Sequence, residues 1–132
     1  MKNTIKSVLN AGSDSWIIDI ECAITQGLPN IVIVGLGNKA IDEAKERIRS
    51  AFHSCKLAFP KKRITINLAP ADIPKNSTSF DLAIAASIIA TQQSPSLDIQ
   101  KVAFVGELGL DGTVRSIRGI IGKIISGKKT RP

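Results

Sequence analysis

Alternating apolar and polar residues predict a β-sheet in the first half of the chain. Trp16–Thr25 follows the period of two that is typical of strands with one buried face, and Lys2–Asn10 follows it imperfectly, so we expect an antiparallel hairpin. Ile64–Leu68 alternates in the same way and predicts a further half-buried strand. Asn30–Val34 is almost wholly apolar, which predicts a central strand that is covered on both faces.

Apolar residues at spacings of three and four predict a first helix from about Ala40 to Lys56. Its apolar stripe consists of Ile41, Ala44, Ile48, Phe52 and Cys55. Glu43 and Arg47 stand four residues apart with the acid first. We therefore expect these two side chains to form an ion pair on the outer face of the helix.

A second helix is predicted over Leu82–Ala90, where nearly every residue is small or apolar. Pro70 and Pro74 end the strand that precedes it, because proline has no N–H to donate. Ser77–Ser79 can cap the helix, and Asp81 lies in its first turn, where the helix dipole favours an anion.

The last third of the chain predicts a strand, a hairpin and a helix. Val102–Val105 is apolar and predicts a buried strand, and Asp111-Gly112 predicts a type I′ turn between Gly106–Leu110 and Thr113–Ile117. A final helix is expected from about Arg118. This order of elements predicts an α+β domain in which helices pack on a mixed sheet in two layers.

Length and composition indicate a single small domain. The chain has 132 residues, and 43% of them are hydrophobic, which is enough for one core. The N-terminus has no signal-peptide pattern and no apolar run approaches the roughly 18 residues of a membrane span, so we expect a cytoplasmic protein without membrane contact. Cys22, Cys55 and His53 have no partners at metal-ligand spacing. We expect no metal site and two buried cysteines.

The formal net charge is +7, from 18 Lys and Arg against 11 Asp and Glu, which is compatible with binding to nucleic acid. The basic residues form two groups, and no acid follows Asp111. If both groups meet on one face, weak and non-specific DNA contacts are predicted for Lys61, Lys62, Arg63, Arg115, Arg118, Lys123, Lys128 and Lys129. Alternatively, the second group belongs to a solvent-exposed C-terminal helix and tail, and its cations only compensate the helix dipole. Aromatic residues make up only 4% of the chain, which argues against reading of bases by stacking.

Two glycine motifs suggest nucleotide binding but lack the required context. Gly122–Lys129 has the spacing of a P-loop, yet Lys129 stands where Ser or Thr must bind Mg²⁺. Gly35-Leu36-Gly37 follows a predicted strand, but Ala40 takes the place of the third glycine of a dinucleotide site. We therefore expect no nucleotide cofactor to bind to this chain.

Several motifs resemble those of one protein family. Asn67–Lys75 reads NLAPADIPK, and Phe80–Ala85 follows with FDLAIA. This pattern resembles the N-terminal, ChlI-type domain of the ComM/YifB magnesium-chelatase-like AAA+ ATPases. The resemblance covers about Lys2 to Gly127 and includes Gly27–Pro29, Ile33–Leu36, Glu43–Ala51 and Val105–Gly112.

The resemblance implies a Lon-protease-like domain over residues 1–127, with the ribosomal protein S5 domain 2-like fold. Residues 128–132 would be a basic tail or a truncated linker to an AAA+ module that is missing from this chain. ATP and Mg²⁺ would bind to that module. The family acts in ATP-dependent DNA branch migration during competence, so the implied partners are DNA, the AAA+ module and further copies in a homo-hexamer.

Lon-type proteases use a serine and a lysine, and the resemblance places only one of them here. Ser79, five residues after Pro74, corresponds to the serine, whereas Ile121 corresponds to the lysine and Lys123 lies two residues further on. A serine without a base in hydrogen-bond reach is a poor nucleophile. We therefore expect Ser79 to be a vestigial catalytic position whose hydroxyl caps the next helix or meets solvent.

These observations favour a non-catalytic accessory domain that supplies assembly contacts and weak DNA binding. Two alternatives stay open. One is a Lon-like serine peptidase with Ser79 as nucleophile, and the other is a structural oligomerisation module whose charge is incidental.

Overall fold

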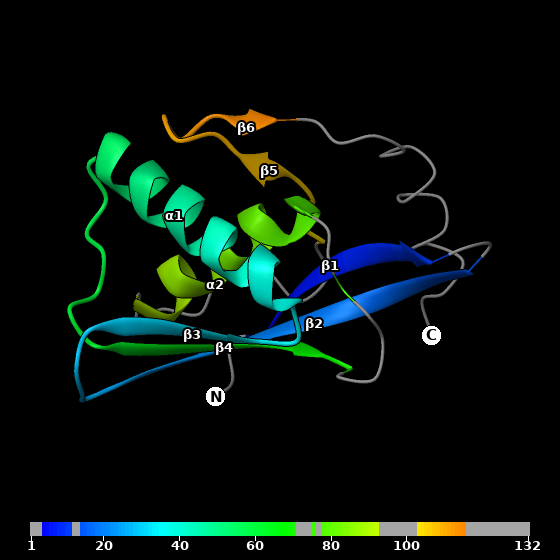
Figure 1. Ribbon diagram of the computed structural model, residues 1–132, viewed down its shortest axis with the longest axis horizontal. Helices are drawn as coiled ribbons and strands as arrows, with labels where there is room; N and C mark the ends of the chain where they lie inside the picture. Colours follow the sequence, from blue (N-terminus) through cyan, green and yellow to red (C-terminus); the bar gives the residue numbers. More distant parts are fainter. Residues whose placement is uncertain (1–3, 12–13, 71–74, 76–77, 93–102, 116–132) are drawn as a thin grey trace.

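A four-stranded mixed sheet forms one layer of the domain (Figure 1). The computed structural model describes residues 4–11, 14–70, 75, 78–92 and 103–115. The strands are β1 (Thr4–Ala11), β2 (Asp14–Thr25), β3 (Asn30–Val34) and β4 (Arg63–Ala69), in the spatial order β1-β2-β4-β3. β2 is antiparallel to β1 and to β4, whereas β3 is parallel to β4. The predicted hairpin and the predicted strand at Ile64 are confirmed.

Two helices, α1 (Asn38–Ser54) and α2 (Asp81–Gln92), cover one face of this sheet (Figure 1). A 3₁₀ turn, η1 (Thr78–Phe80), leads into α2. A short hairpin of β5 (Glu107–Leu108) and β6 (Val114–Arg115) lies on the side of the helices away from the sheet. The described residues therefore confirm the α+β class, with helices packed on a mixed sheet.

The core between the sheet and the helices is almost entirely aliphatic. Strand register places Ile5 opposite Ile20, and Ile20 opposite Leu68, so that the alternating residues share one face. Fully inaccessible side chains come from all four strands and both helices, and include Ile18, Ile20, Ile31, Ile48, Ile64, Ile66, Leu68, Ile84 and Ile88. Burial of each such side chain stabilises the fold by about 1.5–3 kcal/mol.

The position of β3 corrects the prediction of a central strand. Among the described strands β3 lies at the edge of the sheet, and the one strand that it pairs with is β4. Ile31 and Ile33 are buried, but Asn30 and Val34 are exposed, so only one face of β3 is covered. The parallel β3–α1–β4 crossover explains this arrangement, because α1 packs over one face of the strands that it connects.

The β5–β6 hairpin has a different turn from the predicted one. Gly109 N–H donates to the carbonyl of Thr113 at 2.8 Å, and Gly112 N–H donates to the carbonyl of Gly109 at 3.0 Å. The loop thus contains the three residues Leu110, Asp111 and Gly112, with Gly112 at a φ of +88°. This is the three-residue loop with a left-handed glycine, not the two-residue type I′ turn.

The predicted strand Val102–Val105 is only partly formed in its described residues. Ala103 makes an isolated parallel bridge with Lys6, and Phe104 N–H donates to the carbonyl of Lys6 at 2.8 Å. The predicted final helix lies outside the described residues.

The end of α1 explains why the cysteine prediction fails at Cys55. The apolar stripe is buried through Phe52, but Cys55 is exposed because the helix has already ended at Ser54. Cys22 on β2 is partly buried, and this burial raises the pKa of its thiol.

Lys56 closes α1 in a conformation that usually belongs to glycine. Leu57 N–H donates to the carbonyl of Phe52 at 2.9 Å, and Lys56 N–H donates to the carbonyl of His53 at 3.1 Å. These are the two bonds of a Schellman motif, in which the residue at the position of Lys56 is left-handed. The φ of Lys56 is accordingly +57°.

Replacing Lys56 with glycine should therefore stabilise the domain. An L-residue in this conformation costs about 1–2 kcal/mol, part of which the larger chain entropy of an unfolded glycine offsets. We expect a gain of about 0.5–1 kcal/mol in the free energy of unfolding, measured by urea denaturation. Lys56→Val is the control in the opposite direction, because a β-branched residue fits the left-handed conformation poorly and should destabilise the domain. A Gly variant that is no more stable than the Val variant would contradict this account.

Candidate functional site

The start of α2 contains the residue that corresponds to the Lon-type serine. Ser79 lies in η1, and no part of it is accessible to solvent. Its carbonyl accepts the N–H of Gly106 at 3.0 Å, and Leu82 N–H donates to the carbonyl of Gly106 at 3.1 Å. These two backbone bonds hold η1 and α2 against the segment before β5. Of the two surroundings that we expected for the Ser79 hydroxyl, burial excludes solvent.

A buried ion pair joins α1 to the first turn of α2. Arg47 donates from Nε to Oδ2 of Asp81 at 2.6 Å and from its terminal nitrogen to Oδ1 at 3.1 Å. The same Oδ2 also accepts the backbone N–H of Leu108 at 3.2 Å. The Asp81 side chain is only 2% exposed and that of Arg47 is 19% exposed. We call this arrangement the Arg47–Asp81 clamp, because it ties α1, α2 and β5 together.

The clamp shifts the ionisation of both partners. Burial raises the pKa of the Asp81 carboxyl, while the Arg47 guanidinium and the Leu108 N–H oppose that rise. The hydrogen bond to Asp81 raises the pKa of Arg47. The predicted Glu43–Arg47 ion pair is wrong, because Arg47 turns inward to Asp81 rather than along its own helix.

A second polar contact links η1 to the hairpin next to the clamp. The Thr78 hydroxyl donates to Oε2 of Glu107 at 2.7 Å. Arg115, on β6, reaches to 4.0 Å from the other carboxylate oxygen of Glu107. Polar groups from α1 and β5 thus hold the start of α2 around the buried Ser79, and Arg115 of β6 lies beside them.

Lys75 is the largest buried polar side chain, and its burial was not predicted from the sequence. It is 1% exposed, and its Nζ donates to the carbonyl of Pro70, which follows β4. Its Cε lies beside Gly35, at 3.3 Å from where a Cβ on that glycine would stand. Lys75 therefore ties the connection between β4 and α2 to the end of β3. The Lon lysine position, Ile121, and Lys123 lie outside the described residues.

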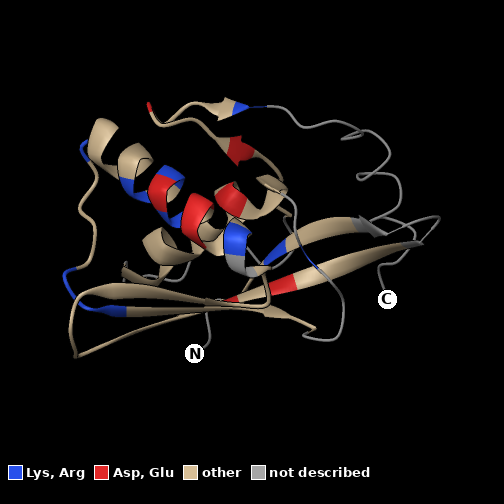
Figure 2. Cartoon of the chain, in the orientation of Figure 1, with Lys and Arg blue, Asp and Glu red and all other residues tan. Residues whose placement is uncertain are grey.

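The structure separates the predicted DNA-binding residues that it describes. Lys61, Lys62 and Arg63 are exposed at the beginning of β4. Arg115 lies on β6, across the helix layer from the sheet, so this described member of the second group does not join the first group in one patch (Figure 2). The remaining predicted contacts, Arg118, Lys123, Lys128 and Lys129, lie outside the described residues.

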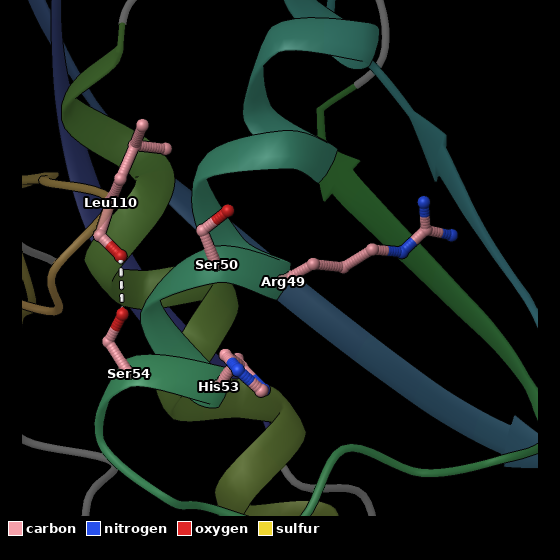
Figure 3. A pocket seen from close by; sticks show the side chains of 5 residues that line it. All are labelled: Arg49, Ser50, His53, Ser54 and Leu110. Atoms are coloured by element: carbon pink, nitrogen blue, oxygen red, sulfur yellow. Dashed lines mark hydrogen bonds between the residues drawn. The ribbon is translucent and has the colours of Figure 1, made fainter.

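A shallow hollow opens between the second half of α1 and the hairpin (Figure 3). It has a volume of about 470 Å³ and is lined by Arg49, Ser50, His53, Ser54 and Leu110. The Ser54 hydroxyl donates to the carbonyl of Leu110 at 2.9 Å and joins the two walls. In the described part of the chain, no group of three or more His, Cys, Asp or Glu side chains could hold a metal ion. No described helix is long and apolar enough to cross a membrane.

Comparison with known families decides the relationship of this chain. Residues 20–131 match the family described as subunit ChlI of Mg-chelatase. The chain belongs to the ChlI family. The predicted resemblance to magnesium-chelatase-like proteins is thus confirmed.

Individual relatives connect this ChlI-type domain to ComM, YifB and, more distantly, Lon. It is 38% identical to the competence protein ComM of Haemophilus influenzae over 96% of this chain, and 43% identical to the uncharacterized protein YifB of Salmonella typhimurium over 79%. Lon protease 1 of Bdellovibrio bacteriovorus is 29% identical over 86% of this chain. The chain spans 25%, 21% and 15% of these three proteins, about a quarter or less of each.

Proposed function

We propose that this ChlI-type domain is a non-catalytic accessory domain of a magnesium-chelatase-like AAA+ ATPase. Its membership of the ChlI family and its 38% identity to ComM support this proposal. The AAA+ module would bind ATP and Mg²⁺, the domain would supply assembly contacts in a cytoplasmic homo-hexamer, and the whole protein would act in DNA branch migration. The identity to Lon protease 1 and the mixed sheet with its helices support a Lon-like, S5 domain 2-like fold.

The burial of Ser79 carries the non-catalytic part of the proposal. A nucleophile must reach the scissile bond of a substrate, and it needs a base within hydrogen-bond reach. Ser79 has no exposed surface, and η1 is fixed from both sides by the bonds to Gly106 and by the contact of Thr78 with Glu107. A peptide substrate would have to displace the residues that cover Ser79 to reach its hydroxyl.

Unfolded casein provides the test of this proposal. We expect the whole chain to hydrolyse fluorescently labelled casein no faster than buffer alone, because the buried Ser79 hydroxyl cannot reach the scissile bond of a substrate. The same measurement on Ser79→Ala separates a trace contaminant from true activity. Hydrolysis by the wild-type chain that disappears in a folded Ser79→Ala variant would overturn the non-catalytic role.

Weak, sequence-independent DNA binding is the second part of the proposal. Lys61, Lys62 and Arg63 are adjacent and exposed. When such cations contact DNA phosphates, they release the counterions that are condensed on the DNA, which favours binding. Arg115, the last basic residue that the structure describes, lies apart from these three residues and does not extend the surface that they form.

A further inference from the structure

The second half of α1 and the loop after it carry only basic charges. Residues 47–71 contain six Lys or Arg, one His and no Asp or Glu. Arg47 is bound to Asp81 in the clamp, and the other six residues are exposed. The Lys and Arg among them lie toward one end of the domain (Figure 2). We call this surface the basic face, and it consists of Arg49, His53, Lys56, Lys61, Lys62 and Arg63.

Packing holds the two parts of the basic face in a fixed relation. Phe59 in the loop packs edge-on against Phe52 of α1, with ring centroids 5.1 Å apart. Gln92 at the end of α2 donates to the carbonyl of Ala58 at 3.3 Å, and Asn30 N–H donates to the carbonyl of Lys62 at 3.4 Å. The loop is therefore tied to α1, α2 and β3. These contacts fix the backbone positions of its lysines.

The hollow adds donors of a second kind to the basic face. Arg49 and His53 both line the hollow and carry planar N–H donors, and the Arg49 guanidinium extends outward, away from Ser54 and Leu110 (Figure 3). Leu110 forms an apolar wall and is 56% exposed. Asp111, the acid next to it, is engaged by Thr113, whose N–H and hydroxyl donate to it at 3.0 and 2.7 Å. These hydrogen bonds lower the pKa of the Asp111 carboxyl.

We infer that a nucleic-acid backbone binds along the basic face, with phosphates held by Arg49 and His53 on the exposed side of α1. This inference rests on the proposed DNA-binding role and adds Arg49 and His53 to the contact residues. Arg49 and His53 are four residues apart on α1, about 6 Å along the helix axis, a distance that spans about two phosphates of one strand at about 3.4 Å each.

The chemistry of the face favours nucleic acid over an acidic protein. Protein interfaces have apolar, aromatic-rich centres. Here Phe52 is buried and Phe59 is partly buried, so the large apolar side chains that are exposed at this end are the three leucines Leu28, Leu57 and Leu110, and no aromatic ring is among them. Arginine is suited to phosphate because its fork of donors matches two phosphate oxygens.

Fluorescence anisotropy of the whole chain with a labelled 20-base-pair duplex tests the inference. Loss of one phosphate contact reduces the salt slope by about 0.9, which corresponds to about eightfold weaker binding at 0.1 M salt. We expect this loss for Arg49→Gln. Lys39→Gln is the matched control, since Lys39 is exposed on the same helix near its opposite end and should change the affinity less than twofold.

Further arms separate this inference from the proposed function. If Lys61→Gln/Lys62→Gln/Arg63→Gln weakens binding but Arg49→Gln does not, the inference is wrong and the DNA-binding role stands. If wild-type binding is absent at low salt, both are wrong. If polyaspartate competes as well as DNA at equal charge, the face is suited to acidic proteins and the inference is overturned. Thermal unfolding of each variant confirms that these exposed substitutions leave the fold intact.

Discussion

Arg47→Met should destabilise the domain by about 3–5 kcal/mol at neutral pH, because it leaves the buried Asp81 carboxylate without its countercharge. The Leu108 N–H would be the remaining described donor to that carboxylate, at 3.2 Å. Methionine conserves the length of the arginine stem, so lost packing adds little to the effect. Urea denaturation gives the free energy of unfolding, and an unchanged m-value would show that the variant differs in stability alone.

Two further variants show whether the effect belongs to the clamp. Arg49→Met removes an exposed arginine from the same helix and should cost less than about 0.5 kcal/mol. The double variant Arg47→Met/Asp81→Leu removes both charges, and it should recover much of the loss because no unpaired charge stays buried. A double variant that is as unstable as Arg47→Met would show that packing, not charge, makes the site sensitive.

The pH dependence of Arg47→Met follows from the pKa of Asp81. Burial raises that pKa in the folded domain, and Arg47 opposes the rise, so its removal should raise the pKa further. A carboxyl with a raised folded pKa binds more protons when folded, so its stabilising effect is present at low pH and is lost as the pH rises through the folded pKa. The deficit of Arg47→Met relative to the wild type should therefore narrow from pH 7 toward pH 4. A constant deficit over this range would contradict the account.

The sequence predicted the elements whose pattern reflects a single interface. Ile64, Ile66 and Leu68 alternate because β4 has one face on the core, and the α1 stripe is buried through Phe52 for the same reason. Asn30–Val34 was misplaced because a short apolar run has the same composition at the edge of a sheet and at its centre. Its place depends on the crossover through α1, which the strand residues do not encode.

The candidate site was predicted only in position. The resemblance placed Ser79 just before the second helix, where η1 and α2 begin. Its burial depends on the docking of Gly106, 27 residues later, and the Arg47–Asp81 clamp joins residues 34 apart. Helix spacing favoured Glu43 as the partner of Arg47, because a local rule contains no information about a buried carboxylate on another helix.

Gly35→Ala should destabilise the domain by about 2–5 kcal/mol, although it adds a single methyl group. Gly35 follows β3 with a φ of +104°, a conformation that L-residues rarely adopt. A Cβ there would lie 2.6 Å from the carbonyl oxygen of Leu68 and 3.3 Å from Cε of Lys75. The first neighbour is backbone of β4 and the second belongs to a buried side chain, so neither can move away at low cost. Backbone strain of about 1–2 kcal/mol and overpacking of about 1–3 kcal/mol together give the expected loss.

Gly37→Ser is the matched control, because it alters the other glycine of the same Gly-Leu-Gly segment. Gly37 caps α1 with a φ of −66°, which any residue adopts, and no side chain caps the helix there. Serine is at least as good a capping residue as glycine, so this variant should be equal to the wild type or slightly more stable. Denaturation midpoints of the two variants, measured side by side, test whether Gly35 is required by packing against β4. Similar midpoints for both would contradict this explanation, whereas a large loss confined to Gly35→Ala assigns that glycine to the fold rather than to nucleotide binding.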